Sequence, residues 1–362
     1  MDTINLQQYA HLALDRKLAR DVLSDSGFTL LREGMVITPN HIRLLKSYDI
    51  ESIPVYGHTS FLEQLDAKVK EQHKPFVSAY RDSFNRMKTL FANTDESGVP
   101  DLDQTLDSFE TLVTESLKSY SLFEVLQQLE GHDGYLLRHS IHVGLLVSLM
   151  AKLMKKPDDE IVEYGKAGLL HDIGMTRMPD SVFHKSGTLT EDEWAQVREH
   201  PQIGYDLLKD KGVSQLVLDA TLYHHERMDG SGYLKGLKGD EIPEVAAMIA
   251  LADVFDAVSS DRVHRSKMAP MEALKTINDD IYRGKLSIRC GLAFIQHMTS
   301  TYTGTTVYLS DGRFAQIVRY QASDLENPMI SLEGKVVQLK DLKGVSIIDI
   351  ADNRVHEMQK ES

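Results

Sequence analysis

The chain has 362 residues, 42% of them hydrophobic and 26% charged, which is the balance of a soluble globular protein with two or three domains. Its net charge of −14 argues against binding a nucleic-acid polymer, whose phosphates attract dense Lys and Arg. The single cysteine, Cys290, excludes an internal disulfide and fits a reducing compartment. No signal-peptide pattern opens the chain, and the most apolar run, 143–154, is too short to span a bilayer, so we expect a cytoplasmic protein without membrane insertion.

Residues 1–100 are expected to form a small mixed α/β module followed by a connector helix. Strand patterns at 18–22 and 27–31 precede Pro39, a residue that favours the first position of a helix. Between 60 and 95, apolar side chains recur at helical spacing. This connector helix is a candidate interface for a homodimer or for a signalling protein partner. Packing within its own domain explains its apolar pattern equally well.

Residues 101–300 show helical periodicity nearly throughout, which predicts a bundle that brings ligands from several helices into one core. Residues 301–362 change to strand patterns, and Asp311-Gly312 between two of them is a strong hairpin signal. The predicted fold class is therefore mainly α, with a small β-rich C-terminal appendage. Helices are expected over 140–155, 159–171, 191–209, 213–223, 243–259 and 271–280.

The most informative stretch is the adjacent pair His171-Asp172, at the end of an apolar helical pattern that Gly174 terminates. Burying an imidazole and a carboxylate together is unfavourable unless they are paired or bound to metal. With five further candidate ligands nearby, the pair makes a set of five imidazoles and two carboxylates. This set is too large for one tetrahedral ion and suits two divalent ions that share a carboxylate. The absence of thiolates favours iron or manganese over structural zinc. The other candidate ligands are His139, His200, His224, His225 and Asp253.

This ligand set, together with the segment His224-His225-Glu226-Arg227-Met228-Asp229-Gly230-Ser231-Gly232-Tyr233, resembles the HD-GYP family of cyclic di-GMP phosphodiesterases, over about residues 115–300. The resemblance implies an HD-type helical bundle in which Asp172 bridges two divalent ions. It assigns His139, His171 and Asp253 to one ion. It assigns His200, His224 and His225 to the other.

The same resemblance implies a catalytic role for His171 and Asp172. A hydroxide activated by two metal ions would open cyclic di-GMP to linear pGpG, with further hydrolysis to GMP left open. Substrate contacts are assigned to four positions: Arg262, Arg265, Gly232 and Tyr233. Bidentate contact with phosphate is the physical reason for the arginines, and surface arginines in a loop are the alternative interpretation.

The sequence departs from the family pattern at two positions, Met175 in place of lysine and Leu234 in place of proline. The lysine is expected beside the scissile phosphate, where methionine supplies no charge. Two alternatives therefore stay open: a metal-bearing receptor that binds cyclic di-GMP with little turnover, and a phosphohydrolase of another cyclic dinucleotide or nucleotide. The full set of seven ligands favours an enzyme.

Tyr135 lies four residues before His139, where some family members carry a glutamate that helps to hold a third metal ion. A tyrosine is a poorer ligand, so two ions are expected. The remaining histidines near the site are interpreted as structural residues: His132, His142, His184 and His264.

Overall fold

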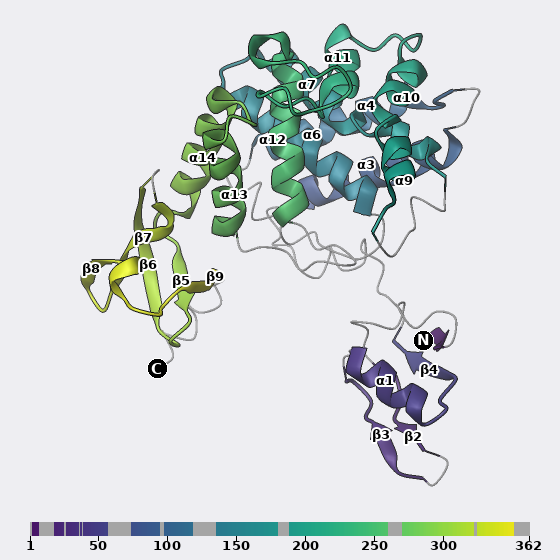
Figure 1. Cartoon of the computed structure of the whole chain (residues 1–362), viewed down its shortest axis with the longest axis vertical. Coiled ribbons are helices and arrows are strands. Elements are labelled where there is room, and N and C mark those ends of the chain that lie inside the picture. The colour runs from purple at the N-terminus through teal and green to yellow at the C-terminus, as the bar shows by residue number, and fades with distance from the viewer. Residues whose placement is uncertain are drawn as a thin grey trace. The chain divides into compact units, whose positions relative to one another are not determined.

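The computed structural model describes residues 2–6, 18–24, 27–35, 37, 39–56, 74–94, 98–118, 135–179, 188–259, 270–321 and 324–350. The chain divides into two compact units, residues 1–67 and 68–362, each of which can be followed in Figure 1. The domain boundary expected near residue 100 falls inside the second unit, because helix α3 (Lys74–Asn93) packs against helices of that unit.

The first unit is a small mixed module. Strand β1 (Asp2–Asn5) pairs antiparallel with β4 (Ser52–Val55), and β2 (Val22–Leu23) pairs with β3 (Thr29–Leu31). Helix α1 (Pro39–Ser47) begins at the proline, as predicted, because the first helical position needs no amide hydrogen bond. A compact apolar core holds the module together: Leu6, Leu18, Val22, Leu31, Ile37, Leu45, Ile53 and Val55.

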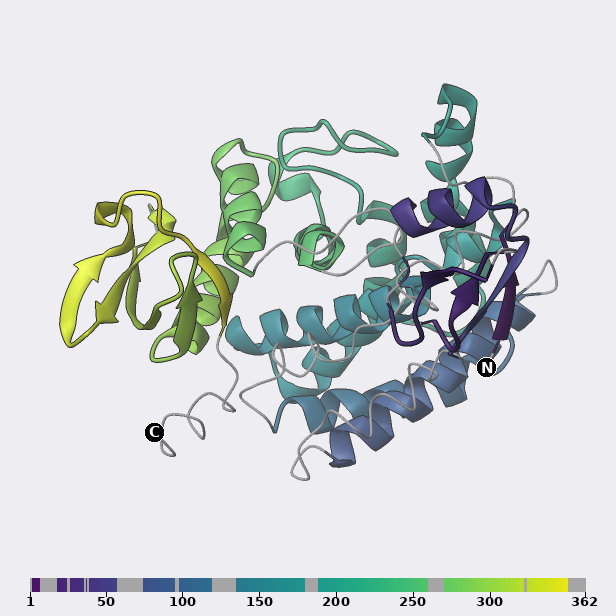
Figure 2. The same cartoon turned by 90° about the horizontal axis from the view of Figure 1, so that it is seen from below.

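The second unit is mainly α-helical, which confirms the predicted fold class, and Figures 1 and 2 show its helices gathered together. After α3, its helices within the described residues are α4 (Leu102–Ser116), α6 (Tyr135–Leu153), α7 (Asp158–Leu170), α9 (Glu191–Val197), α10 (His200–Leu208), α11 (Gln215–Tyr223), α12 (Glu244–Ser259), α13 (Pro270–Tyr282) and α14 (Ile288–Tyr302). Short 3-10 segments are η3 (Ile173–Arg177) and η4 (Gly239–Glu241).

One predicted helix, 191–209, was wrong as a single element, because it is divided into α9 and α10. Pro201 lies in the first turn of α10, where its missing N–H is tolerated, whereas in a helix interior it would break the hydrogen-bond ladder. The division places the buried His200 at the start of α10, where its Nδ1 atom is 2.6 Å from the carbonyl oxygen of Val197, the last residue of α9.

Helix α6 lies at the centre of the second unit. It packs against α7 through Gly144 and Gly168: a Cβ atom on Gly168 would lie 2.8 Å from the Cα atom of Gly144. By length and composition α6 is the one helix among the described residues that could cross a membrane, yet 78% of its apolar window is buried inside the protein. Its apolar side chains are therefore those of a core helix.

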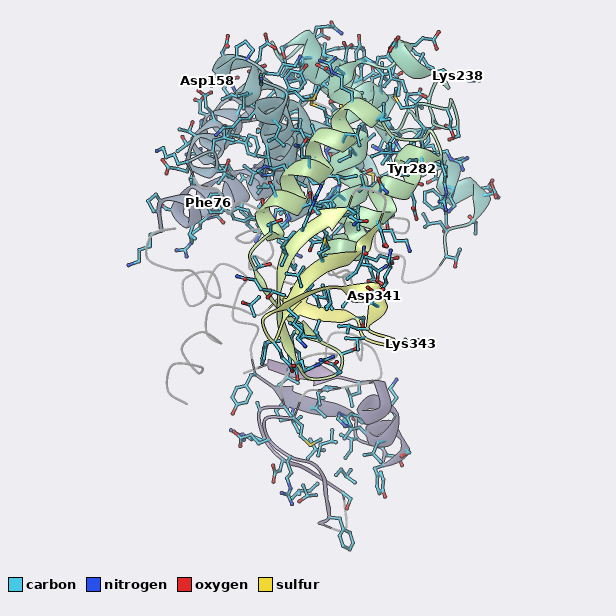
Figure 3. The ribbon with its side chains drawn as sticks, turned by 90° about the vertical axis from the view of Figure 1, so that its left-hand side faces the viewer. Phe76, Asp158, Lys238, Tyr282, Asp341 and Lys343 are labelled. Atoms are coloured by element: carbon cyan, nitrogen blue, oxygen red, sulfur yellow. The ribbon has the colours of Figure 1, made fainter. Side chains whose placement is uncertain are left out.

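The C-terminal strands form an antiparallel sheet in the order β8-β7-β6-β5-β9. The predicted hairpin is confirmed between β5 (Thr306–Leu309) and β6 (Phe314–Gln321), and Gly312 has the positive φ of 88° that its turn requires. The sheet is completed by β7 (Asp324–Leu332), β8 (Lys335–Gln338) and β9 (Ile347–Ile350). Figure 3 labels Asp341 and Lys343, at the end of the short helix η5 (Leu339–Asp341) and just after it.

Candidate metal centre

The site is built around the turn that follows α7. His171 is the C-terminal cap of that helix, and Asp172 leads directly into η3. Gly174, expected only as a helix stop, has a second role: a Cβ atom there would lie 2.0 Å from the carbonyl oxygen of His200. Only glycine permits this contact between η3 and α10, and the contact places the Asp172 carboxylate 3.1 Å from His200 Nε2.

The seven candidate ligands lie together and form two groups, within each of which the potential ligand atoms lie no more than 4.8 Å apart. One group consists of His139, His171 and Asp253, and the other of Asp172, His200, His224 and His225.

The carboxylate of Asp172 lies between these two groups. Its Oδ1 atom is 3.1 Å from His200 Nε2 and 3.5 Å from His224 Nε2. Its Oδ2 atom faces the other group, 3.4 Å from His171 Nε2 and 3.8 Å from His139 Nε2. A single carboxylate thus presents one oxygen to each group, which is the arrangement of a bridging ligand.

The hydrogen bonds of the imidazoles fix which nitrogen faces the centre. Nδ1 of His171 donates to the carbonyl oxygen of Gly168 at 2.7 Å, and Nδ1 of His200 donates to Val197 at 2.6 Å. His224 Nδ1 donates to the Thr221 carbonyl oxygen at 2.9 Å. Because a carbonyl only accepts, each Nδ1 carries a hydrogen, and each Nε2 faces the site and presents a lone pair there when the imidazole is neutral.

Two observations show that cations fit these lone pairs. The Nε2 atoms of His200 and His224 are 3.1 Å apart, and two acceptors at that distance repel unless a proton or a cation lies between them. His171 Nε2 is buried and makes no hydrogen bond within the described part of the chain. Buried acceptors without a donor are unfavourable, and metal coordination would satisfy them.

The electrostatics of the site keep its carboxylates ionised. Burial acts to raise the pKa of Asp172, but the imidazoles of His171, His200 and His224 hold it well below its usual range. Burial lowers the pKa of His224 to about 4, so that imidazole is neutral near pH 7. Burial also acts to lower the pKa of His139, but the neighbouring Tyr135 and the carboxylates of Asp253 and Asp256 raise it well above the usual value.

Of the predicted substrate contacts, Gly232 and Tyr233 lie beside the second group. A Cβ atom on Gly232 would lie 2.4 Å from the carbonyl oxygen of His225, so glycine lets the loop fold against the metal-ligand segment. The ring of Tyr233 stacks on that of His225 at 4.6 Å between centroids and 21° between planes. Arg262 and Arg265 lie outside the described residues.

The residues at which the sequence departs from the family pattern are also placed. Met175 lies half-buried in η3, three residues after Asp172, and Leu234 is 38% exposed. His142 lies outside both groups, whereas Tyr135 stacks on the ring of His139 at 5.6 Å. The predictions for His132, His184 and His264 concern positions outside the described residues.

Sequence reasoning missed two buried carboxylates at the site. Asp256 accepts a hydrogen bond from His139 Nδ1 at 2.7 Å, and its signal was its position one helical turn after Asp253. Glu226 is 1% exposed and accepts from the backbone N–H groups of Lys235 at 2.7 Å and Leu237 at 3.0 Å. It therefore folds the loop that carries Tyr233 back onto the site. The signal available in the sequence was the position of Glu226 directly after the candidate ligands His224 and His225.

Two guanidinium groups near Tyr233 were also missed. Burial raises the pKa of Tyr233, Asp172 and Asp253 raise it further, and the charges of Arg227 and Arg198 partly offset these effects. Arg227 donates to the backbone carbonyl oxygens of His224 and Glu226, whereas Arg198 is exposed at the end of α9. A lone arginine in a helical pattern carries no signal in the sequence.

Part of the helical region is similar to known proteins. Residues 124–283 match a family described as HD domain. The chain is 36% identical over 208 residues to a cyclic di-GMP phosphodiesterase of Pseudomonas aeruginosa, which covers 57% of this chain and 50% of that protein. It is 32% identical over 148 residues to a 3'3'-cGAMP-specific phosphodiesterase of Vibrio cholerae, which covers 41% of this chain and 32% of that protein. The chain thus spans half of the first relative and about a third of the second.

The fold has a counterpart among solved structures. An HDG"Y"P protein from Bdellovibrio bacteriovorus superimposes with a TM-score of 0.53 at 19% sequence identity, covering 83% of this chain and 98% of that one. At this identity the likeness concerns the fold alone.

Proposed function

We propose that this chain, whose residues 124–283 match a family described as HD domain, hydrolyses a phosphodiester bond of a cyclic dinucleotide, with cyclic di-GMP as its substrate. The observation that supports this most strongly is the position of Asp172, whose two carboxylate oxygens face two separate groups of imidazole nitrogens. The curated relatives named as phosphodiesterases of cyclic dinucleotides support the choice of substrate class.

His139, His171 and Asp253 would hold one divalent ion, His200, His224 and His225 the other, and Asp172 would contact both. When bound, two such ions supply an activated water and offset the charge of a phosphoryl group. Imidazole and carboxylate ligands without thiolate suit iron or manganese. The proposed product is linear pGpG, with further hydrolysis to GMP as the alternative.

The residues of the chain prepare the site before any substrate arrives. Asp172 and Asp253 are ionised at neutral pH, because the surrounding imidazoles lower the pKa of both carboxyl groups against the effect of burial. Their negative charge and the inward-facing Nε2 lone pairs create a region that attracts cations. An anionic substrate would be repelled from the same region until that charge is neutralised, so binding of cyclic di-GMP should depend on metal loading.

Arg198 is proposed to contact the second phosphate of the substrate. Arg198 is the C-terminal cap of α9, two residues before the candidate ligand His200, and its charge acts to lower the pKa of Tyr233, which stacks on His225. A guanidinium binds phosphate through two parallel hydrogen bonds. Arg262 and Arg265 stay predictions for the same task.

Product analysis tests the proposal. The protein would be purified without oxygen, loaded with Fe(II) or Mn(II) and incubated with cyclic di-GMP, and the nucleotides separated by chromatography. We expect pGpG or GMP from the native chain and intact substrate from Asp172→Ala. Intact cyclic di-GMP from a native chain that holds two metal ions would contradict the proposed substrate.

A second candidate substrate, 3'3'-cGAMP, is supported by the relative from Vibrio cholerae. A third interpretation, a receptor with little turnover, is supported by Met175, which brings no positive charge to η3. The same chromatographic assay with 3'3'-cGAMP separates the first two substrates by their relative kcat/KM. Tight binding of cyclic di-GMP without any product would favour the receptor.

A further inference from the structure

A line of buried hydrogen bonds connects helix α3 to the candidate ligand His139. The hydroxyl group of Tyr80 lies 3.0 Å from His142 Nε2, and His142 Nδ1 lies 3.1 Å from Asp256 Oδ1. The other oxygen of Asp256 lies 2.7 Å from His139 Nδ1. All four residues are at most 5% exposed, so water does not compete for these contacts.

The donors along this line have one consistent direction. The carboxylate of Asp256 only accepts, so the Nδ1 atoms of both His139 and His142 carry hydrogen. His142 Nε2 is then an acceptor, and the Tyr80 hydroxyl donates to it. Tyr80 thereby selects the tautomer of His142 that can donate to Asp256, and Asp256 in turn selects the tautomer of His139 whose Nε2 faces the site.

We propose that Tyr80 is a positioning residue for the metal ligand His139, acting through His142 and Asp256. This inference rests on the proposed metal-dependent function. Tyr80 belongs to α3, Lys74–Asn93, which lies outside residues 124–283 that match the HD domain. The metal centre therefore depends on a side chain from a helix that precedes the matched domain.

A structural role for the tyrosine ring is separable from this role of its hydroxyl group. The ring packs near Phe76 and His142, with centroids 6.1 and 6.0 Å apart, and Tyr80→Phe preserves that packing. Tyr164→Phe is a matched control, because it also removes the hydroxyl group of a buried tyrosine. That hydroxyl donates to Glu244 at 3.1 Å, and neither residue belongs to a ligand group.

The test measures Mn(II) affinity by calorimetry on the full chain, so it does not depend on turnover. We expect Asp256→Asn to weaken binding by about 10- to 100-fold, as loss of a partner that orients a metal ligand does. Tyr80→Phe should weaken it by about fivefold, the effect of one lost hydrogen bond. Tyr164→Phe should bind as the native chain does. In the Asp256→Asn background, Tyr80→Phe should have no additional effect, because the connection is already broken.

The outcomes separate this inference from the proposed function. A native chain that binds Mn(II), with a Tyr80→Phe variant of equal affinity, would contradict the inference alone. Fully additive effects of Tyr80→Phe and Asp256→Asn would also contradict it, because the two residues would then act independently. A native chain that binds no Mn(II), Fe(II) or other divalent ion would contradict the metal-dependent function and this inference together.

Discussion

Four of the five histidines of the candidate metal centre are held in two different ways. His171, His200 and His224 each follow the last turn of a helix and donate Nδ1–H to a backbone carbonyl three residues earlier. Those carbonyls are available because the last four of any helix have no partner within it. His139 lies inside α6, where the carbonyls are already used, and its Nδ1 donates to the side chain of Asp256.

The difference shows what each kind of ligand requires from the rest of the chain. A histidine at a helix end takes its orientation from its own sequence neighbourhood. A histidine in a helix interior needs a distant partner, and for His139 that partner is 117 residues away. We therefore expect the ligand group that contains His139 to be the more sensitive of the two to changes elsewhere in the protein.

The largest effect is expected where both groups meet. Asp172→Ala removes the carboxylate that faces both sets of imidazoles and should lower turnover of cyclic di-GMP by at least about 1000-fold, the scale of losing a central catalytic group. Metal analysis and steady-state kinetics on the same preparation measure it. Retained turnover with two bound ions would show that the two groups do not share this ligand.

Gly174→Ala tests the histidines that lie at helix ends. The new Cβ atom would meet the carbonyl oxygen of His200, so α10 must shift, and we expect turnover to fall by about 100-fold, as displacement of a site group by about 1 Å can do. Gly212→Ala is the control, because Gly212 has a positive φ but open space around it. That variant should lose stability in thermal unfolding and keep its turnover. Equal turnover of the two variants would mean that the contact between η3 and α10 does not set the site.

Asp256→Asn is the matched test of His139, the histidine inside a helix. It should weaken one metal site by about 10- to 100-fold and leave the other near its native affinity, because only His139 among the seven ligands donates to this carboxylate in the described structure. Calorimetric titration resolves the two binding events. Equal weakening of both events would show that the two groups are not independent in their support.

Met175→Lys restores the charge that the family pattern places after the His-Asp pair. If this position faces the substrate, turnover should rise by about tenfold, because a cation stabilises charge that develops on the phosphoryl group. Met178→Lys, at the C-terminal cap of η3, controls for added charge alone. A rate unchanged by Met175→Lys would indicate that the pocket has adapted to methionine.

The smallest effect is a dependence of metal affinity on pH. The pKa values of His139 and His200 are raised, so in the metal-free chain these imidazoles still hold protons above their ordinary pKa of 6.5, and a metal ion must displace them. Mn(II) affinity should therefore increase as pH rises above about 6.5, with release of protons. His224, with a pKa of about 4, should contribute nothing in this range. Titrations in buffers of different ionisation enthalpy count the protons, and an affinity independent of pH would contradict this account.

The contrast between the two kinds of histidine also explains which features the sequence predicts. The fold class followed from apolar helical spacing, and a His-Asp pair and an adjacent His-His pair marked four of the seven candidate ligands. The family resemblance implied the complete set. Local patterns did not mark Asp256 and Tyr80, because their contacts join residues 117 and 62 positions apart. The division of 191–209 could have been predicted from Pro201, whose effect on a helix interior is local. The contacts proposed for Arg198 depend on how a loop folds, which periodicity does not report.

The central claim is that one carboxylate connects two metal ions, and electron paramagnetic resonance of the Mn(II)-loaded native chain tests it most directly. Two ions joined through Asp172 should give a stoichiometry of two per chain and the spectrum of an exchange-coupled pair. Asp172→Ala should lose that coupled signal. A native chain that shows only the signal of isolated Mn(II), or a coupled signal that persists in Asp172→Ala, would contradict the claim.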